Sequence, residues 1–206
     1  MQAITDLIMY FQKGGLVMWP LLACSITVIA IAIERFIYYK SVDSGAAFAS
    51  RYCAAVRSGD FAVATELARK GSGQCAQMLA DVEAVAGGKA EKSVFLESRA
   101  GIFMATLRDK LDYLGIIVTM SPLLGLLGTI VGMIGAFSIF NVEAGAPMAI
   151  TGGIGEALIA TATGLCVAIL SLCAHSYFAH RMDNMITDME QCFSALLEAE
   201  TRRARS

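Results

Sequence analysis

The chain has 206 residues, of which 56% are hydrophobic and 17% are charged, and its formal net charge at pH 7 is −2. A composition this apolar, with a mean hydropathy of +0.61, is atypical of soluble globular proteins and favours an integral membrane protein. The sequence has no basic stripe with interleaved aromatic residues, which argues against nucleic acid as a partner.

Residues 1–13 precede the first apolar stretch and carry Asp6 and a late Lys13. A secretory signal peptide would begin with basic residues, so we expect this segment to stay in the mature protein. Its large apolar residues recur at helical spacing. This pattern predicts an amphipathic segment that lies on the outer surface of the membrane that the chain spans. A frayed terminus is the open alternative.

Three stretches contain no Asp, Glu, Lys or Arg, namely residues 14–33, 113–142 and 157–180. As helices, all three are long enough to cross a hydrocarbon core of about 30 Å. Unpaired backbone groups are costly in lipid, and the stretches lack the alternation of barrel strands. We therefore predict an all-α integral membrane protein with three transmembrane helices, at 14–34, 113–140 and 156–180.

The segment between the first two spans, residues 35–112, is predicted to be a cytoplasmic helical region. Glycines divide it into helices at about 43–57, 60–70 and 74–86, followed by a long helix from 89 into the second span. Asp60 is the expected N-cap of the second of these helices. The region has too few large apolar residues for an independent enzyme domain.

The second and third spans carry small residues at helical spacing. Gly125, Gly128, Gly132 and Gly135 line one face of the second span, and Gly164 lies among alanines of the third. Small residues let helix backbones approach closely in lipid, so we assign these five glycines to helix packing in an oligomeric bundle. A short hairpin on the outer side, residues 141–155, is expected to join the two spans.

Basic residues are sorted along the chain. Of the sixteen Lys and Arg, one precedes the first span, eleven lie between the first and second spans, none lies between the second and third, and four follow the third. The positive-inside rule then places the N-terminus outside and the C-terminus on the cytoplasmic side of the membrane. The tail, residues 181–206, has helical periodicity, so long second and third helices are expected to extend into the cytoplasm.

Glu156 stands directly before an uncharged stretch that ends at Arg181. An ionised carboxylate near the centre of a membrane costs at least about 2.5 kcal/mol, so it should face protein or water. An acid in the first turn of a helix is also favoured by the helix dipole, by about 0.3 to 1 kcal/mol. Position alone leaves both interpretations, a functional charge and a helix start, open.

Six cysteines are scattered without any C-x-x-C pair, which favours small hydrophobic residues over a metal or disulfide site. No metal or cofactor is expected. The sequence also lacks H-E-x-x-H, G-x-S-x-G and phosphate-binding loop motifs. A membrane enzyme is therefore the weakest of the functional hypotheses.

Two long motifs, SPLLGLLGTIVGMIGAF at 121–137 and GGIGEALIATATGLCVAI at 152–169, resemble the MotA/TolQ/ExbB proton channel family in order and separation. Within that family the chain is most similar to the three-span ExbB and TolQ branch. The segment 14–39 also resembles the first span of short ExbB proteins. The likeness is strong in the last two spans and weak over 45–90.

The resemblance implies a proton-conducting stator subunit in the bacterial inner membrane that energises TonB-dependent transport. It implies a homopentamer around the single spans of an ExbD/TolR-like partner with a membrane Asp, acting on a TonB-like protein. It further implies that Glu156 is the ion-conducting acid and that Thr129 and Thr161 are the pore threonines. Alternatives are a TolQ-like subunit of an envelope-integrity complex and a non-conducting membrane scaffold.

The chain departs from the family near the inner end of the third span. Leu170 stands where relatives often have proline, so this helix is expected to be straighter. His175 and Ser176 replace the common Tyr-Asn pair. His175 is either a proton relay, since imidazole titrates near neutral pH, or an interface residue with a structural role.

Overall fold

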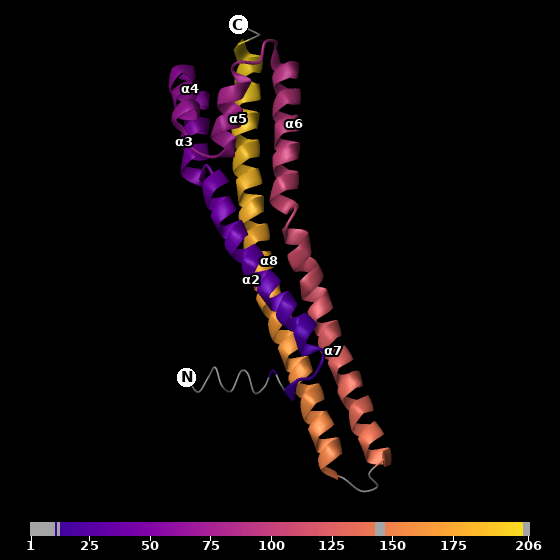
Figure 1. The fold of residues 1–206 in the computed structure, drawn as a ribbon. Coiled ribbons are helices and arrows are strands. Elements are labelled where there is room, and N and C mark those ends of the chain that lie inside the picture. The colour runs from indigo at the N-terminus through magenta and orange to yellow at the C-terminus, as the bar shows by residue number, and fades with distance from the viewer. Residues whose placement is uncertain (1–10, 12, 143–146, 204–206) are drawn as a thin grey trace. The chain divides into compact units, whose positions relative to one another are not determined.

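The computed structural model describes residues 11, 13–142 and 147–203. The amphipathic segment predicted at 1–13 falls outside the described residues except for positions 11 and 13. Every regular element in the described part is a helix (Figure 1), which confirms the all-α fold. The helices are α2 (Met18–Val42), α3 (Ala46–Arg57), α4 (Phe61–Lys70), α5 (Gln74–Val82), α6 (Lys89–Arg108), α7 (Leu111–Val142) and α8 (Pro147–Arg203).

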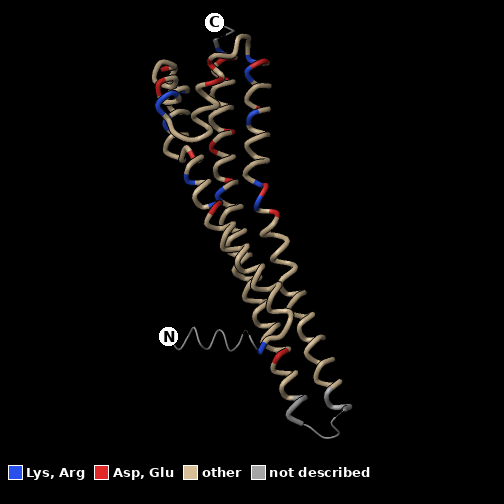
Figure 2. The backbone as a smooth tube through the Cα atoms, in the orientation of Figure 1, with Lys and Arg blue, Asp and Glu red and all other residues tan. Residues whose placement is uncertain are grey.

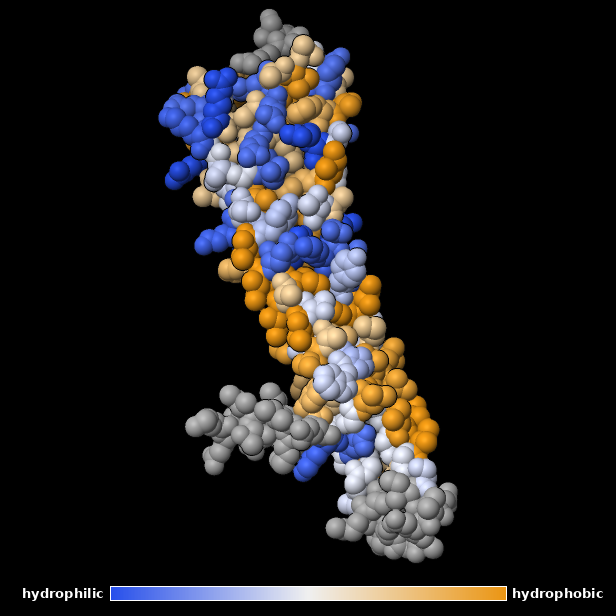
Figure 3. Space-filling model, in the orientation of Figure 1, coloured by the Kyte–Doolittle hydropathy of each residue, from blue (hydrophilic) through white to orange (hydrophobic). Residues whose placement is uncertain are grey.

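Within the described residues, three helical stretches are long and apolar enough to cross a membrane: Met18–Arg57, which includes α2, Lys89–Ser138, which includes most of α7, and Thr151–Arg202, which includes most of α8. The chain forms two compact units: residues 1–33 with 112–176, and residues 34–111 with 177–206. Figure 2 shows the charged residues concentrated on helices of the second unit, whereas the described spans are mostly uncharged. On the face drawn in Figure 3, hydrophobic side chains cover most of the first unit.

The first unit is built around α7 and α8, which lie side by side (Figure 1). Gly125 and Gly164 meet there, and a Cβ on Gly164 would lie 3.0 Å from the Gly125 Cα. Ser171 donates a hydrogen bond of 2.9 Å to the carbonyl of Leu114 across the same contact. Close backbone approach, reinforced by a buried hydroxyl, therefore joins the two helices where lipid provides no hydrophobic drive.

In the second unit α3, α4, α5 and α6 pack in succession. The C-terminal part of α8 contacts α3 through Cys192 and α6 through Glu200. Asp60 accepts a hydrogen bond of 3.2 Å from the Val63 amide, which confirms it as the N-cap of α4. The predicted apolar side of the tail is buried at Met185, Met189 and Cys192. A helix with one apolar stripe is stabilised by burying that stripe, which explains why this segment stays helical.

The sequence prediction was wrong at the end of α6. The helix expected to run from 89 into the second span is interrupted: α6 ends at Arg108 and α7 begins at Leu111. Donors from α2 replace the amides that a continuous helix would supply. Arg35 donates to the Thr106 carbonyl at 3.0 Å, and the Tyr39 hydroxyl donates to the Leu107 carbonyl at 3.0 Å.

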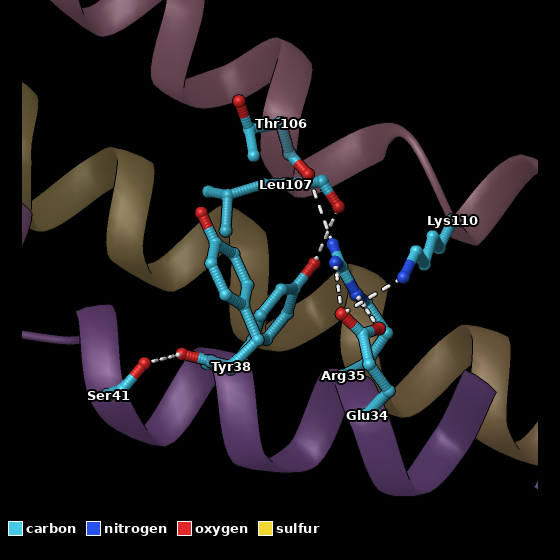
Figure 4. A network of polar contacts seen from close by, with 8 residues as sticks. Glu34, Arg35, Tyr38, Ser41, Thr106, Leu107 and Lys110 are labelled. Carbon is cyan, nitrogen blue, oxygen red and sulfur yellow. Dashed lines mark hydrogen bonds and ion pairs between the residues drawn. The ribbon is translucent and has the colours of Figure 1, made fainter. Parts of the chain in front are cut away.

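Charge surrounds this junction (Figure 4). Arg35 is buried and forms an ion pair of 2.7 Å with Glu34, which also contacts Lys110 at 3.1 Å. Arginine suits this position because its planar group can hold a carboxylate and a backbone carbonyl together. Because the contacts satisfy the carbonyl groups at the end of α6, the break is part of the stable fold.

We expect Arg35→Met to lower the free energy of unfolding by about 1.5–3 kcal/mol, because it removes the charged donor from the part-buried hydrogen bond to the Thr106 carbonyl. The measurement is chemical unfolding of the purified chain in detergent. Arg108→Met is the matched control, since Arg108 is exposed in the last turn of α6 and should change stability by no more than about 0.5 kcal/mol. Equal effects of the two substitutions would contradict the role of Arg35.

Candidate functional site

Glu156 lies well inside α8. The helix begins at Pro147, so its first turn contains no acid and Glu156 is the tenth residue. The interpretation of Glu156 as a helix start is therefore wrong, and much of the predicted hairpin 141–155 is helical. The glycines at 152, 153 and 155 resemble a turn in sequence. Gly153, however, serves helix packing, because a Cβ there would lie 2.7 Å from the Gly132 carbonyl oxygen.

The Glu156 side chain lies against the Gly14–Gly15 turn that precedes α2. A Cβ built on Gly15 would overlap the Glu156 Oε1 and would lie 2.7 Å from the Cδ. The Glu156 side chain itself is only partly exposed. Sequence reasoning missed this contact, although the adjacent glycines before an apolar stretch were a visible signal of an unusual backbone.

Thr161 lies at the contact between α7 and α8. Its hydroxyl is 3.2 Å from the Gly125 carbonyl and 3.2 Å from the Ala157 carbonyl, so it can donate to either. Thr129 instead donates within its own helix, to Leu126 at 2.7 Å. No hydrogen bond or ion pair among the described residues joins Glu156, Thr129 and Thr161.

Thr163 follows Glu156 by seven residues and so projects from nearly the same side of α8. Its hydroxyl donates to the carbonyl of Ile159 at 2.8 Å, one turn earlier. A lone threonine in a membrane helix commonly makes this bond to its own backbone. The described part of one chain thus contains separate polar positions and no continuous polar stripe.

The glycines assigned to helix packing differ in how closely they approach the neighbouring helix. Cβ atoms on Gly125 and Gly132 would lie 3.1 Å from the Thr161 Cα and 3.0 Å from the Gly153 carbonyl oxygen, and one on Gly128 would overlap Ala160. A Cβ on Gly135 meets no atom within 4 Å. The packed face continues instead at Ala136, which is 3% exposed. A packing role for Gly135 stays a prediction.

Two further polar groups lie in this unit: Ser121, which the sequence did not single out, and His175, the candidate relay. Ser121 is fully buried, and its hydroxyl has no hydrogen-bond partner in the described structure. His175 lies opposite Gly115, where a Cβ would be 3.8 Å from the imidazole Nε2. Both side chains lie at the contact between α7 and α8. A relay role for His175 therefore stays a prediction. The described residues contain no group of three or more His, Cys, Asp and Glu side chains able to hold a metal.

Comparison with known proteins gives one family match, to the MotA/TolQ/ExbB proton channel family over residues 74–191, which is more than half of the chain. Among curated proteins, the ExbB-like 1 protein of Synechocystis sp. is 34% identical over 79% of this chain, which spans 66% of that relative's length. Biopolymer transport protein exbB1 of Vibrio cholerae is 27% identical over 87% of this chain and 82% of its own length. Tol-Pal system protein TolQ of Pseudomonas aeruginosa is 36% identical over 39% of this chain and 35% of its own.

Proposed function

Since the chain belongs to the MotA/TolQ/ExbB proton channel family, we propose that it is a proton-conducting stator subunit of an ExbB-ExbD-type complex in the bacterial inner membrane. The complex uses the proton-motive force to energise TonB-dependent transport across the outer membrane. The observation that carries this proposal is Glu156, a carboxylate within an apolar membrane helix and in neither its first turn nor a described ion pair.

Proton conduction needs groups that bind and release protons along a route through the lipid. Intramembrane acids are rare because of their cost, and they commonly mark ion pathways. In the proposed mechanism, Glu156 exchanges a proton with a membrane Asp supplied by a single-span ExbD/TolR-like partner. Thr129 and Thr161 line the pore, and the two carboxylates together complete the proton route that one chain lacks.

The proposed assembly is a homopentamer around the spans of that partner. Ion flow turns the pentamer and the partner relative to one another, and a TonB-like protein receives the motion. The asymmetric distribution of Lys and Arg supports a periplasmic N-terminus and a cytoplasmic C-terminus. The threonine on the α7–α8 contact is compatible with a pore wall made of these two helices from each copy.

The proposal is tested by reconstituting the chain with its single-span partner in proteoliposomes and measuring proton uptake under an imposed potential. We expect uptake only when both proteins are present, because the route requires a carboxylate from each. Vesicles with either protein alone are the controls. Uptake by the complex that does not exceed uptake by either component alone would refute the proposal.

A TolQ-like role in an envelope-integrity complex is the second candidate, favoured by the 36% identity to a Tol-Pal system protein over 81 residues. The two candidates share the conducting subunit and differ in the process that it energises. A deletion strain distinguishes them. Loss of receptor-dependent uptake with an intact outer membrane supports the first, and leakage of periplasmic proteins supports the second.

A further inference from the structure

The turn before α2 meets the Glu156 side chain at a residue that has no side chain of its own. Gly15 has a φ of +73°, a backbone conformation that favours glycine. A Cβ at this position would overlap Oε1 and would come within 3.2 Å of the Glu156 Cγ. The missing side chain at Gly15 therefore provides the space that the carboxylate occupies.

Packing on both sides fixes this turn. A Cβ on Gly14 would lie 3.2 Å from the Ile159 side chain of α8, and Val17 lies 3.7 Å from the position of a Cβ on Gly128 of α7. Val17, Met18 and Leu21 are buried and form a core cluster, and the partly buried Leu124 packs against it. The turn thus cannot withdraw easily from the carboxylate, because its own side chains are anchored in the bundle.

We propose that Gly15 is a positioning residue for Glu156, and that the Gly14–Gly15 turn forms the wall against which the carboxylate rests. This inference rests on the proposed function. The turn restricts the rotamers of Glu156 and so fixes where its carboxyl group meets a partner. It also brings the acid to the N-terminal end of α2, where the helix dipole favours negative charge.

The test replaces Gly15 with alanine in the reconstituted complex. We expect proton flux to fall about tenfold to a hundredfold, because displacement of a reacting group by about 1 Å has an effect of that size. Gly45→Ala is the matched control. Gly45 also has a positive φ, of +80°, but a Cβ there meets no atom within 4 Å. It introduces similar backbone strain without touching the acid.

A rescue variant distinguishes positioning from general damage. Aspartate is one methylene shorter than glutamate, so Glu156→Asp should withdraw the carboxylate from the methyl group added at position 15. We expect the double variant Gly15→Ala with Glu156→Asp to conduct several-fold better than Gly15→Ala alone. A merely structural defect at Gly15 would not be repaired by shortening a different side chain.

Assembly with the partner, measured by size-exclusion chromatography, is checked for every variant. If Gly15→Ala fails to assemble, Gly15→Asn takes its place with Gly45→Asn as control, because asparagine tolerates a positive φ better than alanine. Flux in Gly15→Ala equal to that in Gly45→Ala, or a double variant no better than Gly15→Ala, overturns the positioning role and leaves the proposed function standing. Wild-type flux in Glu156→Gln would overturn both.

Discussion

Replacing Glu156 with glutamine is expected to reduce proton flux through the complex by at least about a hundredfold, in line with the loss of a group that transfers protons. The substitution retains the size of the side chain and its place beside Gly15, and it removes only the ability to release and rebind a proton. A defect in flux would therefore be chemical in origin. The measurement is potential-driven proton uptake by proteoliposomes that contain the chain and its partner.

Glu97→Gln is the matched control for this prediction. Glu97 is exposed on α6, and its contact is a hydrogen bond of 2.9 Å from Ser93 on the same helix. Like Glu156→Gln, this substitution removes one negative charge, but at a position distant in sequence from the candidate acid. Flux should therefore stay at the wild-type level. Comparable flux in both variants and the wild type would exclude Glu156 from the proton route.

Gly164→Ala is expected to destabilise the first unit by about 1–3 kcal/mol, the usual penalty for overpacking a close contact. The added Cβ would lie 2.6 Å from the Ser121 carbonyl oxygen and 3.2 Å from the Gly125 nitrogen. Both are backbone atoms, so relief requires α7 and α8 to separate. The measurement is the thermal unfolding midpoint of the detergent-solubilised chain, with the yield of assembled complex as a second readout.

Gly155→Ala provides the control on the same helix, because a Cβ on Gly155 meets no atom within 4 Å. Alanine has the higher helix propensity, so this change should be neutral or stabilise by up to about 1 kcal/mol. The difference between the two variants isolates the close α7–α8 contact from the general effect of removing a helical glycine. Equal unfolding midpoints would show that Gly164 does not hold the helices together.

The sequence was sufficient to predict the fold class and the three spans. Transfer of a helix into lipid depends on the sum of its residues, and uncharged stretches such as 157–180 carry that information locally. The N-cap at Asp60 was predicted for a similar reason, because capping involves a residue and the amide three positions later. The candidate acid and its surrounding motif were also visible without coordinates.

Helix boundaries near the candidate site were harder to predict. Residues 152–155 were predicted to belong to the hairpin 141–155, yet they lie in α8, where Gly153 fits closely against α7. Helical spacing predicted Gly135 on the packed face, which stays a prediction, and within one chain the structure buries the neighbouring Ala136. Periodicity identifies a face only to within about one residue, and the neighbouring helix decides which residue is buried.

By itself the sequence determined that this protein is helical, has three apolar stretches able to span a membrane and carries one acid directly before the third of them. Only the tertiary structure decided that α6 and α7 are separate helices, since Arg35 and Tyr39 supply the donors at the break. The tertiary structure likewise decided that the Glu156 side chain lies against Gly15. The physical reason is range: hydropathy and capping act between neighbours in the chain, whereas these contacts join residues about 70 and 140 positions apart, which no local pattern encodes.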